Sequence, residues 1–218
     1  MIHPDKLFAD ARGRAWHPDA KFRALQASVR FILAHADKFE WSLQGMGMLR
    51  LYLGDTRLHV WDQTHAAPGV SMIHDHQQWG LRSTVIAGSL INQRYVERGQ
   101  WQPMWFPFHA VTLKAGYGCA FVDQPRLTWL RPLTPECYGP GESYGQLPGE
   151  IHESKPQGIV VTLMQKLPTG SDLARVFWPQ GSQWGSAEPR PATRDEIVDI
   201  TRKAVMTIDD AMARGNSP

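Results

Sequence analysis

Apolar and polar residues recur at helical spacing near the start of the chain. Between positions 18 and 36, the apolar residues Phe22, Leu25, Val29 and Ile32 follow one another at intervals of 3, 4 and 3 positions. This spacing places them on one face of an α-helix, while basic and polar residues occupy the other faces. The pattern therefore predicts an amphipathic helix in this segment.

From Met46 onward the pattern changes to short runs rich in β-branched, aliphatic and aromatic residues, separated by Gly, Pro, Asp and Asn. Such runs are typical of strands joined by turns. They read MLRLYL, RLHVW, SMIH, LRSTVIAGSLINQRYV, HAVTL, GCAFVD, LTWLRP and GIVVTLMQ. Many short strands at close intervals predict an all-β fold, an antiparallel sandwich or barrel.

A second helix is predicted near the end of the chain. After Pro168 the sequence is rich in Gly, Pro and Ser, as in a connector. The run TRDE, from Thr193 to Glu196, fits a capping box, in which each side chain accepts a hydrogen bond from the backbone N–H of the other residue. An apolar stripe at helical spacing follows the box and consists of Ile197, Ile200, Ala204 and Ile208.

These patterns predict one domain with helical appendages. The chain has 218 residues, of which 42% are hydrophobic, an ordinary content for a globular protein with its own core. We expect a helical segment over residues 1–45, a β-barrel over 46–168, and a connector with a helix over 169–218.

Charge and apolar content exclude several classes of protein. The chain carries 23 basic and 21 acidic residues and has no dense basic run, so we expect no nucleic-acid partner. No apolar stretch approaches the ~20 residues of a membrane span, and the first residues lack the apolar core of a signal peptide. The only cysteines are Cys119 and Cys137, too few for a disulfide framework. We expect a soluble, cytoplasmic protein without a membrane partner.

Three histidines form the main candidate for chemistry. His74 and His76 lie one residue apart at the end of a predicted strand, so both point to the same side while Asp75 points away. His152 follows a turn marked by Gly149 and leads into the strand GIVVTLMQ. Closure of a barrel would bring this strand beside the first one.

Two interpretations of these histidines compete. A single inward histidine on a strand is most often a hydrogen-bonded core residue. Two histidines that point to the same side of a strand, together with a third from another strand, favour a metal site. Three neutral imidazoles suit a borderline divalent ion such as Fe(II), Co(II), Ni(II), Cu(II) or Zn(II), and they leave positions open for a substrate or oxygen.

The motifs around these histidines resemble those of the cupin superfamily. His74, His76 and Gly88, which lies twelve residues after His76, resemble the first cupin motif, and the run from Pro148 to His152 resembles the second. The resemblance implies a double-stranded β-helix, or jelly-roll, barrel that holds a metal. The usual first motif also carries a glutamate at the position of Gly80 or Leu81, so a carboxylate ligand is not expected here.

The resemblance narrows to the bacterial branch of the cysteine dioxygenase family. IHDHQQWG followed by VIAGSLINQRY is similar to its HDH, WG and strand-end pattern, and the similarity extends roughly from Arg50 to Gln165. It implies that His74, His76 and His152 hold Fe(II), which binds a thiol substrate and O2 and yields a sulfinic acid. An arginine on an early strand pairs with the substrate carboxylate in that family, and Arg50 is the best-placed residue here. An outward, solvated Arg50 is the competing interpretation.

One departure from the family concerns proton handling. The family carries a Ser, His, Tyr relay at alternate positions of the last strand, where this sequence has Thr162, Met164 and Lys166. A non-redox cupin, an isomerase or lyase using Zn(II) or Ni(II), is therefore an alternative, and a ligand-binding cupin without turnover is another. The aromatic and proline-rich insertions between the motifs would either roof the pocket or form contacts in a homo-oligomer.

Several neighbouring residues have weaker claims. His59, His65 and His109 are spare imidazoles, and His65 is expected in a surface loop. Tyr144 and Glu150 flank the third histidine and are candidates for hydrogen bonds that fix its tautomer. Packing between sheets is the favoured use of Trp79.

Overall fold

The computed structural model describes residues 20–77, 79–114, 120–121, 123–167, 173–185 and 188–214, which form a mainly β fold flanked by two helices. Helix α1 spans Ala20–Ala34, helix α2 spans Arg194–Arg214, and a short 3-10 helix, η2, spans Ala36–Lys38. Both predicted helices are thus present. Neither long helix of the described chain has the length and apolar composition that a membrane crossing requires.

Each run predicted from the sequence overlaps a described strand, and the structure adds several short strands that were not predicted. The run SMIH enters a strand only at His74, and the described strand within GCAFVD is Ala120–Phe121. The bounds are β1 Ser42–Gln44, β2 Met46–Leu53, β3 Thr56–Ala66, β4 His74–His76, β5 Gly80–Arg98, β6 Phe106–Lys114, β7 Ala120–Phe121, β8 Arg126–Pro132, β9 Glu136–Tyr138, β10 Ser143–Gln146, β11 Ile151–Leu167, β12 Leu173–Pro179 and β13 Arg190–Pro191. Strand β12 falls within the segment expected to be a connector.

The described strands join into one antiparallel sheet that is partly closed. Its order is β10-β5-β8-β6-β12-β4-β11-β3-β2-β1-β13, and β5 also pairs with β11. This additional pairing closes β5, β8, β6, β12, β4 and β11 into a ring. Strands β3, β2, β1 and β13 extend the sheet beyond β11. The predicted all-β antiparallel architecture with a helix at each end is confirmed at this level.

Pairing between the long strands β5 and β11 closes the ring of strands, because each of the two takes part in both layers of the fold. They pair from Ile151 opposite Tyr95 to Leu167 opposite Gly80, with an irregularity near the middle. Gly88 lies at this irregularity with φ +82°, and a Cβ at this position would overlap the carbonyl oxygen of Ile159. Only glycine meets both conditions without strain.

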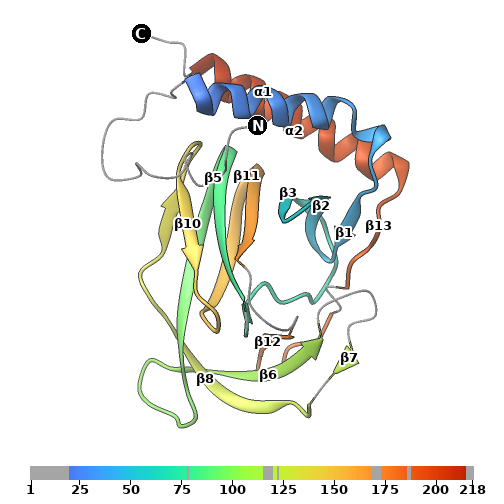
Figure 1. The fold of residues 1–218 in the computed structure, drawn as a ribbon. Coiled ribbons are helices and arrows are strands. Elements are labelled where there is room, and N and C mark those ends of the chain that lie inside the picture. Colours follow the sequence, from blue (N-terminus) through green and yellow to red (C-terminus); the bar gives the residue numbers. More distant parts are fainter. Residues whose placement is uncertain are drawn as a thin grey trace.

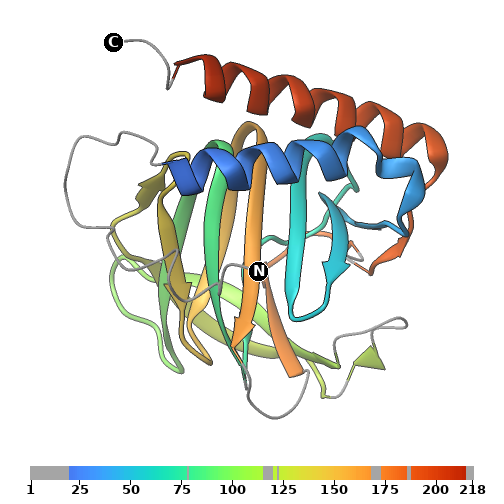
Figure 2. The same ribbon diagram turned by 45° about the horizontal axis from the view of Figure 1, so that its top comes forward.

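The two helices cover one face of the sheet. Helices α1 and α2 lie side by side over β5, β11 and β3, and β6, β8 and β12 form the layer on the far side (Figure 1, Figure 2). The predicted apolar faces point inward, because Val29, Ile200, Ala204 and Ile208 are buried. Full burial of a large aliphatic side chain contributes about 1.5–3 kcal/mol. Burial of the helix faces therefore attaches both helices to the sheet.

The capping box predicted for the second helix is formed. The Thr193 N–H donates to Oε2 of Glu196 at 2.8 Å, and the Glu196 N–H donates to Oγ1 of Thr193 at 3.3 Å. Arg190 also donates to the Glu196 carboxylate, at 2.8 Å. The pKa of Glu196 is lowered to about 2, chiefly because its carboxylate accepts hydrogen bonds from Arg190.

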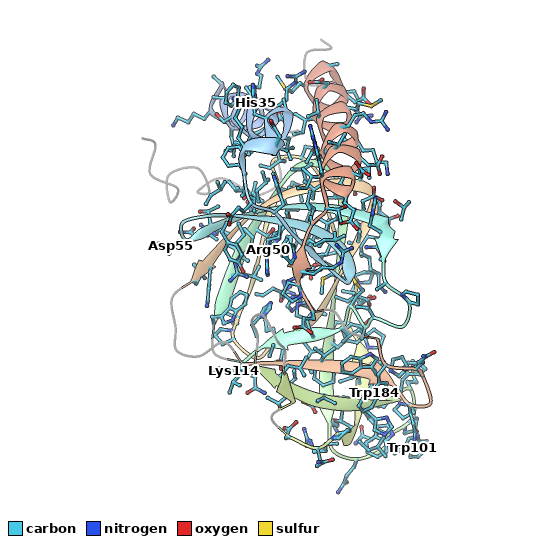
Figure 3. All side chains as sticks on the ribbon, turned by 90° about the vertical axis from the view of Figure 1, so that its right-hand side faces the viewer. His35, Arg50, Asp55, Trp101, Lys114 and Trp184 are labelled. Carbon is cyan, nitrogen blue, oxygen red and sulfur yellow. The ribbon has the colours of Figure 1, made fainter. Side chains whose placement is uncertain are left out.

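Strand alternation separates a helix-facing side of β2 from an inner side. Leu49 and Leu51 pack in the apolar cluster beneath the helices, whereas Met48 belongs to a second cluster with Trp61, Trp79 and others. Arg50 lies between the two leucines in sequence and therefore points to the inner side. In Figure 3 it lies on the side of the β2 and β3 ribbons away from the helices. This inner side faces the candidate site.

Candidate metal centre

The structure brings the three predicted histidines together. Strand β4 pairs with β11, and His74 lies directly opposite His152. One ring nitrogen from each of His74, His76 and His152 lies within 4.8 Å of those of the other two. The ring centroids are 4.9 Å apart for His74 and His76 and 4.5 Å apart for His74 and His152. Two segments far apart in the sequence thus contribute to one cluster.

Backbone carbonyl groups orient two of the three rings. Nδ1 of His74 lies 2.8 Å from the Met72 carbonyl oxygen, and Nδ1 of His152 lies 3.0 Å from that of Glu150. A carbonyl oxygen only accepts, so each Nδ1 carries the proton and each Nε2 keeps a lone pair. Burial lowers the pKa of His74, and it lowers the pKa of His152 to about 3. Both imidazole rings are therefore neutral and can offer a nitrogen lone pair to a metal, which is the form that metal binding needs.

The third ring, His76, is stacked on Trp79. Their centroids are 3.7 Å apart with planes inclined by 25°. Burial, followed by electrostatic interactions with His74, His152, Arg57 and Lys166, holds the pKa of His76 well below its ordinary value. Nδ1 of His76 is buried and has no hydrogen-bond partner within the described part of the chain. A buried nitrogen left unpaired costs about 1–3 kcal/mol, which a ligand at the cluster would offset.

These features fit a bound divalent metal. The cluster offers three neutral imidazoles, two of them held in a defined tautomer by hydrogen bonds on the other ring nitrogen, as is usual for metal-binding histidines. Among the described residues, this cluster consists of the three imidazoles. The donor set suits Fe(II), Co(II), Ni(II), Cu(II) or Zn(II) and does not by itself select among them.

Asp75 points away from the cluster, as the alternation of the strand predicts. It is fully buried on the opposite face, where its Oδ1 accepts a hydrogen bond from the Arg175 N–H at 2.9 Å. Asp75 and Arg175 are directly opposite each other in the pairing of β4 with β12. The strand that carries two candidate ligands is therefore held on its outer face by an ion pair.

Arg50 lies on the inner face and is buried, with 7% of its surface exposed. Its Nε donates to Ser42 Oγ at 3.3 Å, and its guanidinium carbon is 4.7 Å from the centre of the Tyr52 ring. Arg50 is opposite His59 in the pairing of β2 with β3, and His59 is opposite Thr162 in the pairing of β3 with β11. These three side chains therefore form one row on the inner face.

The positions expected for a relay also face this side. Thr162 accepts a hydrogen bond from Trp61 Nε1 at 3.2 Å, and Met164 is buried in the same apolar cluster as Trp79. Lys166 Nζ lies 5.1 Å from the centre of the Trp79 ring. Lys166 therefore places a positive charge at the position where the family pattern has a tyrosine. This charge is one of the causes that lower the pKa of His76.

Tyr144 and Glu150 act differently from their predicted roles. The Glu150 backbone carbonyl, rather than its carboxylate, orients His152, while the carboxylate accepts a hydrogen bond from the Leu147 N–H at 2.7 Å. The buried Tyr144 hydroxyl is hydrogen-bonded with Ser83 and Ser154, and burial raises its pKa. Ser83 and Ser154 lie on strands other than that of Tyr144, so sequence spacing contained no signal for these two hydrogen bonds.

A second cluster of potential ligands is an ion-pair network. Asp62, His65 and Asp199 also lie within reach of one ion, and His65 belongs to β3 rather than to a loop. However, Lys203 Nζ lies 2.8 Å from Asp62 and 2.6 Å from Asp199. The lysine ammonium already supplies the cation for both carboxylates. His109 is likewise outside the three-histidine cluster, with its ring 5.8 Å from that of Trp184.

The cysteines contribute nothing to this centre among the described residues. Cys137 is exposed, with its Sγ 3.3 Å from Ser89 Oγ, and Cys119 lies outside the described residues.

No protein-family profile matches the chain, and no curated protein matches it in sequence. The geometry of the site is therefore the basis for assigning a function.

Proposed function

We propose that this protein is a cupin-type, mononuclear metal enzyme, and that it is a non-haem Fe(II) dioxygenase acting on a small thiol acid. The observation that carries the proposal is the cluster of His74, His76 and His152, three neutral imidazoles on paired strands beside a basic inner face. The motif resemblance and the partly closed antiparallel sheet support the same class.

The chain itself binds and orients the substrate in this proposal. Arg50 forms a charge-assisted, two-point contact with the substrate carboxylate, for which its planar guanidinium is suited. The apolar cluster around Trp61, Trp79 and Met164 excludes water from the reacting sulfur. When bound, Fe(II) supplies open coordination positions and redox chemistry that bring a thiolate and O2 together. The reaction RSH + O2 → RSO2H is balanced without an external reductant.

Oxygen uptake by iron-loaded protein tests the proposal. We expect thiol-dependent O2 consumption with a panel of small thiol acids, and one sulfinic acid formed per O2 consumed, measured by mass spectrometry. His74→Ala is the control, because it removes one ligand. Arg50→Met should raise KM more than it lowers kcat, because it removes substrate binding and leaves the metal ligands intact. Uptake equal to that of the His74→Ala protein would reject the thiol substrate class.

A non-redox metal enzyme is the second candidate, an isomerase or lyase using Zn(II) or Ni(II) as a Lewis acid. It is favoured by the inner side chains of Thr162, Met164 and Lys166, none of which is the His or Tyr of the family relay. Metal analysis of protein purified without added ions separates the two candidates. Zn(II) in the purified protein, with no oxygen uptake after iron loading, would favour this second function.

A further inference from the structure

A second polar group of residues lies on the inner face, away from the three histidines. Arg50, His59 and Thr162 form one row across β2, β3 and β11. Arg57 lies two residues before His59 on β3, and directly opposite residues and residues two apart share a face. The Arg57 and His59 side chains therefore point to the same inner side as Arg50.

His59 has an unmet hydrogen-bonding group in this position. The residue is 6% exposed, and its Nε2 is buried without a hydrogen-bond partner among the residues that the structure describes. Burial, and then the charges of Arg50 and Arg57, hold the pKa of His59 well below its ordinary value. Two cations thus face a neutral ring that offers one donor and one acceptor. Buried polar atoms are normally paired, so a ligand is the natural partner.

Arg57 connects this row to the metal centre. Its guanidinium carbon lies 5.0 Å from the centre of the Tyr52 ring and 5.5 Å from that of the Trp79 ring, on which His76 is stacked. The charge of Arg57 acts on both His59 and His76. Arg57 is therefore positioned between the candidate ligands and the row that contains Arg50.

The inner-face rows that contain Arg57 and His59 include no acidic side chain among the described residues. The two inner rows consist of Ser42, Arg50, His59, Thr162 and Val85, and of Tyr52, Arg57, Met164, Ser83 and Tyr144. None of these described residues is acidic. A cation beside an unpaired buried imidazole nitrogen, without a carboxylate in its row, is a setting that attracts an anion.

We propose that Arg57 and His59 form an anion subsite that takes a second acidic group of the substrate, so that the preferred substrate is a small thiol dicarboxylate rather than a monocarboxylate. The thiol part of this inference rests on the proposed function, and the subsite itself does not. Arg50 on β2 and Arg57 on β3 are diagonal neighbours, because Arg50 is opposite His59 and Arg57 lies two residues before it. Such neighbours are about 7–8 Å apart, and their long side chains can approach each other to bind the two carboxylates of a four- or five-carbon dicarboxylate.

Binding of two simple acids to the metal-free protein tests the subsite without thiol or oxygen chemistry. Succinate and butyrate have the same chain length and differ in one carboxylate, and calorimetric titration at fixed salt compares them directly. We expect succinate to bind at least about ten-fold more tightly, as one additional charged hydrogen bond would give. Arg57→Met should reduce this ratio to less than about three-fold while the affinity for butyrate stays within about two-fold.

Further variants separate a binding role from a structural one. His59→Leu should also reduce the ratio of the two affinities, and Arg57→Lys should partly restore it because the charge remains. Arg82→Met, on the exposed outer side of β5, is the matched control and should leave the ratio unchanged. Far-ultraviolet circular dichroism checks that each variant is folded. Equal binding of succinate and butyrate by the parent protein would overturn the subsite, as would equal loss of both acids in Arg57→Met.

The oxygen assay then distinguishes this inference from the proposed function. Mercaptosuccinate and 3-mercaptopropionate differ in the same single carboxylate, and we expect the first to have the lower KM with iron-loaded protein. Tight succinate binding without oxygen uptake from either thiol would retain the subsite and reject thiol oxidation. Uptake with equal KM for both thiols would retain thiol oxidation and reject the dicarboxylate substrate.

Discussion

Arg175 holds Asp75 on the outer face of the strand that carries two of the three candidate metal ligands. Its Nε and Nη2 lie 2.7 and 2.5 Å from Oδ2 of Asp75, and its Nη1 donates to Glu97 at 2.7 Å. Asp75 is fully buried. Because His74 and His76 flank Asp75 on the opposite face, this ion pair restricts the rotation of β4 and so the direction of both imidazoles.

Removing the Arg175 side chain should destabilise the protein strongly. Arg175→Met leaves the Asp75 carboxylate buried without its partner, which costs about 3–5 kcal/mol in comparable cases. Urea unfolding measures the loss. Arg126→Met is the control, because Arg126 pairs with Glu97 in the same network but is largely exposed, and exposed pairs contribute about 0–1 kcal/mol. Equal losses in the two variants would show that the buried pair has no special role.

Each of the three histidines should be needed for metal binding. We expect His152→Ala to weaken Co(II) binding more than about 100-fold, since even removal of a residue that only orients a ligand costs 10–100-fold. Visible absorption of the Co(II) protein measures the affinity and the coordination. His109→Ala, which changes a histidine outside the cluster, should bind one Co(II) as the parent protein does. Undiminished binding by His152→Ala would remove His152 from the site.

Acidification should destabilise the metal-free protein partly through His59. Burial together with Arg50 and Arg57 holds its pKa well below 6.5 in the folded chain. As the pH falls below 6.5, the unfolded chain takes up a proton on this residue while the folded chain does not, so the free energy of unfolding decreases. We expect His59→Gln to reduce the slope of the unfolding free energy against pH by about 1 kcal/mol per pH unit around pH 5.5. Urea unfolding at several pH values measures both slopes, and parallel curves would contradict the prediction.

The capping box should stabilise the second helix measurably. Thr193→Ala removes the hydroxyl that accepts from the Glu196 N–H, and we expect a loss of about 1 kcal/mol in thermal or urea unfolding. Thr207→Ala makes the same change inside the helix, where the hydroxyl donates to the Lys203 carbonyl oxygen. Alanine favours a helix interior more than threonine does, so this control should be neutral or slightly stabilising. A loss in Thr207→Ala as large as that in Thr193→Ala would assign the effect to something other than the cap.

Protonation of Glu196 provides a second test of the capping box. The pKa of Glu196 is lowered to about 2, chiefly by the hydrogen bond from Arg190. The stabilisation is present above the ordinary value of 4.5 and decreases as the pH falls toward 2. The difference between the parent protein and Glu196→Gln should therefore shrink over this interval. A stability difference between the two proteins that stays constant over this pH interval would contradict this prediction.

Features that depend on neighbouring residues were predictable from the sequence. The helix faces follow from spacing over three and four positions, and the cap from residues three apart. The common direction of His74 and His76 follows from strand alternation, which also predicts that Asp75 points away. In each case the physical rule operates over a few residues, so the sequence contains the whole signal.

The pairing of distant strands decided the rest. His152 reaches His74 because β11 pairs with β4, and Arg175 reaches Asp75 because β12 passes through a segment that reads as a connector. Likewise, His59 and Arg57 become part of the inner face through the register of β3 with its neighbours. The sequence by itself determined the helices, the strand runs and the candidate ligands. Only the tertiary structure decided which side chains meet, because strand register is set by the packing of the whole sheet, and a shift of one residue reverses every side chain on a strand.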